Sequence, residues 1–293
     1  MTLPHLLMVL LVNFAWGFNF IVGKIGAETF GPLFFTGLRF TFLLLLMFPW
    51  LKPVPGAMKS LLSVAFLLGA VHFSMVFIGL HAGGNIGSVA ITTQLYVPFS
   101  AILATLLLRE KMGVVASLAT VFAFSGVVLI GFDPVVFDHL DAILWTMGAA
   151  FVMALATIMM RRSPNLGVFR LQAWIALVAV PSVFTLSFIF EANHGEIVGA
   201  ASLIDFWTPL YSAVGASIIG HGMLYYLLCR YPVSTVTPLL LPAPVLATFF
   251  GVVLLGDNLG TELIVGGIMT ILGVLVLLRY GGCGRNARSL ADT

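Results

Sequence analysis

The sequence is poor in charged residues. Only 8% of its 293 residues are Asp, Glu, Lys or Arg, whereas 60% are hydrophobic, and a soluble domain carries about 25% charged residues. A soluble chain with so few charges would lack the polar surface that keeps a protein in solution. The mean hydropathy of +1.13 has the same meaning. The sequence therefore predicts an integral membrane protein whose apolar surface faces the lipid bilayer.

Other absences exclude further classes of protein. The net charge is only +2, and no basic stripe or run of like charges suggests a nucleic-acid partner. Two cysteines, Cys229 and Cys283, are too few for a disulfide framework and lack metal-ligand spacing. The start of the chain has neither a cationic segment nor a signal-cleavage pattern, so we interpret its first apolar run as a retained helix. No metal, cofactor or obligatory protein partner is predicted.

What the sequence does contain is a series of ten long apolar runs. A membrane-spanning helix needs about 20 mostly apolar residues, and continuous runs without apolar–polar alternation favour helices over a barrel. Charges, prolines and glycine clusters separate the runs. The predicted fold class is all-α integral membrane with ten transmembrane helices. The predicted spans are 4–22, 32–50, 58–80, 86–108, 113–131, 140–160, 168–190, 206–228, 234–255 and 262–280.

The basic residues support an even number of helices. If the N-terminus is cytoplasmic and the loops alternate, 11 of the 13 Lys and Arg residues lie on the cytoplasmic side, Lys24 lies outside and Arg39 lies within the second run. The positive-inside rule predicts this asymmetry. Both termini of this multi-pass protein are therefore predicted to be cytoplasmic. The cytoplasmic set is Lys52, Lys59, Arg109, Lys111, Arg161, Arg162, Arg170, Arg230, Arg279, Arg285 and Arg288.

Two segments of the chain resemble each other at a constant offset of 147 residues. The acid-x-x-Gly turn at 110–113 is matched by the turn at 257–260, and Gly126 is matched by Gly273. The alternative is chance similarity between apolar segments. If the repeat is real, each half has five helices, and an odd number forces the halves to lie inverted in the membrane. Inverted repeats are typical of secondary transporters, which bind substrate near the midplane between the halves.

This repeat divides the chain into three parts. The first five-helix unit is predicted at 1–135, the second at 136–281, and a short cytoplasmic tail at 282–293. Alternating access follows if the two units can pack in two nearly equivalent ways. A small-molecule substrate would then pass along the boundary between them.

Several short motifs accompany this arrangement: Asn13-Phe14-Ala15-Trp16-Gly17-Phe18-Asn19-Phe20, Arg39-Phe40, Leu107-Leu108-Arg109-Glu110-Lys111, Leu254-Leu255-Gly256-Asp257-Asn258, and the helix ends from Gly126 and Gly273. In these motifs and in its arrangement the chain resembles the drug/metabolite transporter superfamily, EamA type, over roughly residues 5–280. The second turn departs from the family pattern, because Asp257 stands where a glutamate is usual. The resemblance implies a 5+5 helical fold and export of metabolites across a bacterial inner membrane, and it is strongest toward amino-acid exporters, including the aromatic amino-acid branch.

Polar side chains inside the apolar runs are the candidates for the substrate cavity. Such residues are costly in lipid unless they face a cavity or a partner, and aromatic walls with a few amide or imidazole groups suit a zwitterion. The alternative is ordinary hydrogen bonding between helices. For Arg39 the alternatives are snorkelling and binding of a substrate carboxylate. The candidates are Trp16, Asn19, Arg39, His72, Gln94, Tyr96, His221 and Tyr225.

Prolines mark two of the predicted helices as candidate hinges. Pro98 lies in the fourth run, and Pro238, Pro242 and Pro244 lie in its counterpart, the ninth. Proline removes a backbone hydrogen bond and permits a bend. We therefore expect these two helices to flex during transport.

The sequence also bears on energy coupling and on rival functions. No Asp or Glu lies in the middle of a predicted span, where proton-driven antiporters usually need one, so we expect facilitated, gradient-driven movement. A multidrug or other metabolite exporter is the main alternative. A membrane enzyme is disfavoured, because no metalloprotease motif, intramembrane carboxylate pair or nucleophile elbow occurs. A retinal receptor is disfavoured, because no predicted span contains a lysine.

Overall fold

The computed structural model describes residues 1–109, 112–161, 167–228, 230–231 and 236–280, apart from the side chains at 161, 225, 237 and 238. Across these ranges the chain is helical and has no strand. The predicted 282–293 tail and Glu110 of the first turn lie outside the described residues. The elements are α1 (Leu3–Phe30), α2 (Pro32–Met47), η1 (Phe48–Trp50), α3 (Met58–Ala65), η2 (Phe66–His72), α4 (Phe73–His81), α5 (Ile86–Thr93), α6 (Tyr96–Leu108), α7 (Val114–Ile130), α8 (Pro134–Phe137), α9 (Leu140–Arg161), α10 (Val168–Phe190), α11 (His194–Ala200), α12 (Trp207–Tyr211), η3 (Ser212–His221), α13 (Gly222–Leu228), η4 (Thr237–Leu240), α15 (Pro242–Phe250), η5 (Gly251–Leu255) and α16 (Thr261–Tyr280).

The helices have the length and composition that a bilayer requires. Two shorter apolar helices, Val114–Ile130 and Pro242–Leu255, accompany the long ones, whereas the eighth predicted run, formed by α12, η3 and α13, is in neither group. Large apolar side chains such as Leu106 and Val114 remain exposed, as expected for a surface that lipid covers. Within the described residues, seven helices are long and apolar enough to cross a membrane: Leu3–Phe30, Pro32–Trp50, Met58–His81, Ile86–Leu108, Leu140–Met160, Val168–Phe190 and Thr261–Tyr280.

The largest difference from the predicted spans is at the first helix. We expected it to end at residue 22, but α1 continues to Phe30, so Lys24 and Glu28 lie on the helix and not in a loop. The connection to α2 is a single residue, Gly31, whose φ of 83° is the left-handed conformation that glycine adopts readily. Pro32 then begins α2 at a position where a missing backbone N–H is tolerated.

Several of the membrane helices contain irregular backbone, in their middle or at their end. The segments η2, η3 and η5 are π-helical, and a turn at Gln94 and Leu95 separates α5 from α6. On the ninth predicted run, Leu241 separates η4 from α15 in the same way. Pro98 follows the first break, and Pro242 and Pro244 follow the second. The prolines therefore lie in the first turn of a new helix, where their missing N–H groups are tolerated.

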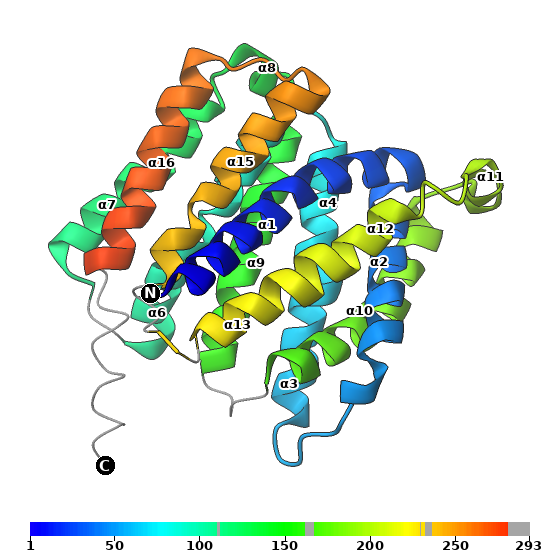
Figure 1. Cartoon of the computed structure of the whole chain (residues 1–293). Coiled ribbons are helices and arrows are strands. Elements are labelled where there is room, and N and C mark those ends of the chain that lie inside the picture. Colours follow the sequence, from blue (N-terminus) through cyan, green and yellow to red (C-terminus); the bar gives the residue numbers. More distant parts are fainter. Residues whose placement is uncertain (110–111, 162–166, 229, 232–235, 281–293) are drawn as a thin grey trace.

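The helices pack in pairs that mirror each other between the two halves of the chain. Helix α1 of the first predicted half packs on α15 and η3 of the second half, and α9 of the second half packs on α6 and α4 of the first. Three further pairs, α2 with α10, α5 with α15 and α7 with α16, join elements at corresponding places in the two halves. In Figure 1, α7 and α16 run side by side at one edge of the bundle, and α11 projects beyond the opposite edge.

The α7–α16 pair is reciprocal at the level of single residues. A Cβ on Gly126 would lie 2.5 Å from the Gly266 carbonyl oxygen, and a Cβ on Gly273 would lie 2.8 Å from the Ala119 carbonyl oxygen. Ala119 and Gly266 are themselves 147 apart. Between them the Thr270 hydroxyl bonds to the Gly266 carbonyl of its own helix at 2.8 Å and also lies 3.3 Å from the Ala123 carbonyl, again across 147 positions. Each helix thus presents the same small-residue patch to its counterpart, as in an interface with two-fold symmetry.

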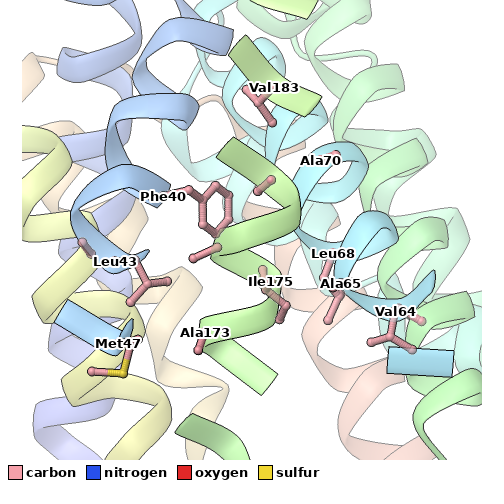
Figure 2. Close-up of a cluster of buried hydrophobic side chains, with 14 of the residues drawn as sticks. Phe40, Leu43, Met47, Val64, Ala65, Leu68, Ala70, Ala173, Ile175 and Val183 are labelled. Atoms are coloured by element: carbon pink, nitrogen blue, oxygen red, sulfur yellow. The ribbon is translucent and has the colours of Figure 1, made fainter. Parts of the chain in front are cut away.

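The largest apolar cluster holds α2, α10 and the α3–η2 segment together. Phe40 and Leu43 on α2, Val64 on α3, and Ile175 and Val183 on α10 belong to it (Figure 2). Alanines on α10 fill the space between the larger side chains, which allows the helices to approach closely. This packing fixes α2 against α10, and with it the buried Arg39.

Carboxylates cap two helices from distant parts of the chain. Glu191 accepts hydrogen bonds from the backbone N–H groups of Leu33 and Phe34 at 2.8 Å, at the start of α2. Asp257 accepts one from the Ile86 N–H at 2.8 Å, at the start of α5. A negative charge at a helix N-terminus satisfies an unpaired donor and complements the helix dipole. The short side chain of Asp257 is therefore adequate for the contact that it makes.

We expect the α7–α16 interface to tolerate no added side chain. Gly126→Ala should lower the free energy of unfolding by about 1–3 kcal/mol, because the new methyl group meets backbone atoms that cannot move independently. Gly199→Ala is the matched control, since nothing lies within 4 Å of a Cβ at that position. Thermal unfolding in detergent measures both variants, and equal midpoints for the two would contradict the close packing.

Candidate functional site

The predicted candidates that lie together gather around Arg39. Arg39 is 1% exposed, and its Nη2 donates a hydrogen bond to the Ser217 hydroxyl at 3.0 Å. The Ser217 hydroxyl donates its hydrogen to the Ser212 carbonyl at 3.2 Å, so the Ser217 oxygen can accept the hydrogen bond from Arg39. The donor–acceptor separation of five residues between Ser217 and Ser212 matches the π-helical turn of η3.

Aromatic rings enclose the guanidinium group. The Arg39 Cζ atom lies 4.1 Å from the centre of the Phe73 ring and 5.4 Å from the centres of the Phe40 and Phe77 rings. Such cation–π contacts stabilise a desolvated cation by about 2 kcal/mol each at best. Beside these rings, the Nε and Nη1 atoms of Arg39 have no hydrogen-bond partner among the described residues.

Two histidines flank this centre, one from each predicted half. His72 ends η2, and its ring centre lies 4.8 Å from that of Phe73, the ring nearest to Arg39. His221 ends η3, four residues after Ser217, which binds Arg39. The Nδ1 of His72 bonds to the Ala149 carbonyl at 2.9 Å, and that of His221 bonds to the Ala216 carbonyl at 3.0 Å. Because a carbonyl oxygen only accepts, Nδ1 carries the hydrogen in both rings, and each Nε2 is left with a lone pair when the ring is neutral.

Trp16 and Asn19 join α1 to the same part of η3. The Trp16 indole N–H donates to the Ala216 carbonyl at 3.0 Å, and its ring centre lies 5.1 Å from that of His221. Asn19 accepts a hydrogen bond from the Ser212 hydroxyl at 2.6 Å. Both side chains therefore make the contacts between helices that were the alternative reading of these residues, and they make them beside the Arg39 cluster.

Gln94 and Tyr96 lie elsewhere. They flank the turn between α5 and α6, and Tyr96 packs against an apolar cluster that contains Ile91 and Leu95. Among the described residues, no hydrogen bond or ring contact joins either of them to Arg39. Tyr225 lies on α13, four residues after His221, and its side chain lies outside the described residues, as does that of Pro238 in η4.

Residues that the sequence did not single out complete the cluster. Ser217 supplies the hydrogen-bond acceptor that Arg39 has within the described residues, Ser212 bonds to both Ser217 and Asn19, and the Phe73 ring lies 4.1 Å from the Arg39 Cζ atom. Gln172 on α10 approaches the Ser217 carbonyl through Nε2 at 3.5 Å. Serines are common in apolar helices, and the five-residue spacing of a π-helix has no sequence signal that we could use. In the described part of the chain, no three potential metal ligands come together.

The helical architecture and this buried polar centre define the chain as a multi-pass membrane protein. A model of the EamA-like transporter family matches it twice, over residues 3–132 and 140–279. The chain therefore belongs to the EamA-like transporter family, as the sequence resemblance indicated. Membership identifies it as a transporter and not an enzyme, and implies a small-molecule substrate.

Relatives and solved structures agree with this assignment. A probable amino-acid metabolite efflux pump of Salmonella typhimurium is 29% identical over 284 residues, covering 92% of this chain and 93% of the relative. A protein of the same description from Escherichia coli is 28% identical over 283 residues, with the same coverage. A solved structure at 14% identity covers 99% of both chains with a TM-score of 0.62, which shows the fold alone.

Proposed function

We propose that this protein exports amino acids or similar small metabolites across a bacterial inner membrane. The two relatives described above are named as probable amino-acid metabolite efflux pumps, and the chain matches each of them over nearly its full length. The buried centre offers one cation, two imidazoles and an indole. Groups of this kind suit a zwitterion with an apolar side chain.

The proposed route runs between two inverted halves of five helices each, 1–135 and 136–281, with both termini in the cytoplasm. The reciprocal contacts of Gly126 and Gly273 at an offset of 147 support this duplication, as do the paired helix contacts and the two family matches. The Arg39 cluster takes α2 and η2 from one half and α10 and η3 from the other. A group bound there would contact both halves, so that movement of one half against the other would expose it to alternate sides.

Left-handed residues end corresponding helices in the two proposed halves. Arg109 ends α6 with φ 56° and ψ 28°, and Gly256 ends η5 with φ 74° and ψ 24°. The two positions are again 147 apart. Glycine adopts this conformation without strain, whereas arginine does so rarely. Equal backbone geometry with such different side chains is what a duplicated turn would retain.

The substrate pathway in this proposal includes all eight candidates from the sequence. Arg39, His72, His221, Trp16 and Asn19 form its centre. Gln94 and Tyr96 lie at the break in the fourth run and would meet the substrate when that helix bends. Tyr225, one turn beyond His221, is assigned to the pathway from its position on α13.

Purified protein in liposomes tests the proposed activity. A panel of labelled amino acids should show counterflow that requires no imposed pH gradient, because the described membrane helices carry no carboxylate at mid-depth. Unlabelled amino acids should compete, and a cationic dye should not. Flux that depends on a pH gradient would overturn the facilitative mechanism. Competition by the dye alone would favour a multidrug exporter.

The proposed hinges predict a transport defect without a folding defect. Pro98→Ala and Pro242→Ala should each lower the counterflow rate several-fold at similar expression, because alanine allows the helix to continue through the break. Pro181→Ala is the matched control, since Pro181 lies inside the unbroken helix α10. Unchanged counterflow in both test variants, or an equal loss in the control, would remove the hinge proposal.

A further inference from the structure

Arg39 carries a charge that nothing in its described surroundings neutralises. Its side chain is buried in α2, and only Nη2 has a hydrogen-bond partner. The Nε and Nη1 atoms are buried and have no partner among the described residues. Buried polar groups in proteins are nearly always hydrogen-bonded, and an unpaired charge is among the least favourable groups to bury. The position therefore calls for an acceptor that the chain does not itself provide.

The helices around Arg39 contain no carboxylate that could serve. The elements packed against α2 are α1, α4, α10, α12, η1 and η3. Of these only α1 contains an acid, Glu28, which lies near its end and is exposed. The sequence has no Asp or Glu between residues 28 and 110, between 141 and 191, or between 205 and 257. An ion pair within this centre is thus not available to the chain.

The aromatic contacts do not remove the need for an acceptor. The Arg39 Cζ atom lies 4.1 Å from the centre of the Phe73 ring, yet the Nε and Nη1 atoms still have no hydrogen-bond partner among the described residues. A carboxylate has two oxygens that accept parallel N–H bonds from arginine, which is the strongest pairing available to this side chain. A neutral amide has only one carbonyl oxygen to offer and carries no charge.

We propose that Arg39, positioned by Ser217, is the binding site for the carboxylate group of the transported molecule. This inference rests on the proposed function and narrows it to substrates that carry a free carboxylate. The lone pairs on Nε2 of neutral His72 and His221 then suit the ammonium group of the same zwitterion. The transported class is the free amino acid, in preference to its amide, its ester or a cationic amine.

A binding measurement that needs no transport tests the carboxylate site. Benzoate and benzamide have nearly the same shape but differ in charge, and both can be titrated against the protein in nanodiscs while its thermal unfolding midpoint is followed. Benzoate should raise the midpoint of the wild type saturably, and benzamide should not. Equal shifts from the two compounds, or no shift from benzoate, would overturn the proposal.

Substitutions test whether benzoate binds at Arg39. Arg39→Gln should weaken benzoate binding at least tenfold, and Ser217→Ala should weaken it several-fold while retaining the charge. Arg230→Gln is the matched control, because Arg230 also lies over a ring, that of Tyr226 at 3.6 Å, but is exposed. If Arg39→Gln does not fold, Ser217→Ala decides alone. An unchanged benzoate response in Arg39→Gln, or in Ser217→Ala when that variant decides alone, would contradict the assignment.

A transport measurement separates this inference from the proposed function. In liposomes that show counterflow of labelled phenylalanine, unlabelled phenylalanine should compete at least tenfold better than phenylalaninamide. Equal competition would refute the carboxylate site and leave amino-acid transport intact. A benzoate response that Arg39→Gln abolishes, without counterflow of any amino acid in the panel, would refute amino-acid export and leave the anion site intact.

Discussion

A lipid environment requires that every backbone polar group find its partner inside the protein, and this constraint governs the rest of the structure. Regular helices satisfy it along most of the chain. Irregular backbone is tolerated at membrane depth only where protein or enclosed water surrounds it. In this protein the π-helical segments η2 and η3 end at His72 and His221, and η3 also carries Ser217, the hydrogen-bond partner of the buried Arg39. The Ser212 and Ala216 carbonyl groups of η3 accept the hydrogen bonds that hold Ser217, Trp16 and His221 in place.

Small residues allow the helices of this protein to pack closely against one another. Apolar side chains gain nothing by leaving lipid for one another, so helices in a membrane associate through close backbone approach. Gly126 and Gly273 provide that approach on α7 and α16, and alanines provide it on α10. Because the α7–α16 contact relates equivalent residues, it lies where the axis between two inverted units would pass in our account.

The sequence predicted an all-helical membrane fold, and seven of its ten predicted spans coincide with described helices that are long and apolar enough to cross a membrane. Arg39, His72 and His221 were found because a charged or imidazole group inside an apolar run is conspicuous. Ser217 and Phe73 were missed, because serine and phenylalanine are common in such helices and only the fold shows which of them meet the guanidinium group. The sequence placed Gln94 and Tyr96 within an apolar run but did not show which way their side chains point, and they lie apart from Arg39. The first loop was misplaced, because a single left-handed glycine can reverse the chain where a longer connection was expected.

The proposed transport pathway, and the proposal that both halves contribute to the Arg39 cluster, depend on the inverted duplication. Its most direct test is the sidedness of Val114 and Thr261, which are 147 apart, exposed, and each the first residue of a helix in the α7–α16 pair. Single cysteines at these positions, with Cys229 and Cys283 replaced by serine, can be labelled in intact cells with a membrane-impermeant maleimide. The account predicts labelling of Thr261→Cys in intact cells and of Val114→Cys only after permeabilisation. Labelling of both from the same side would contradict it.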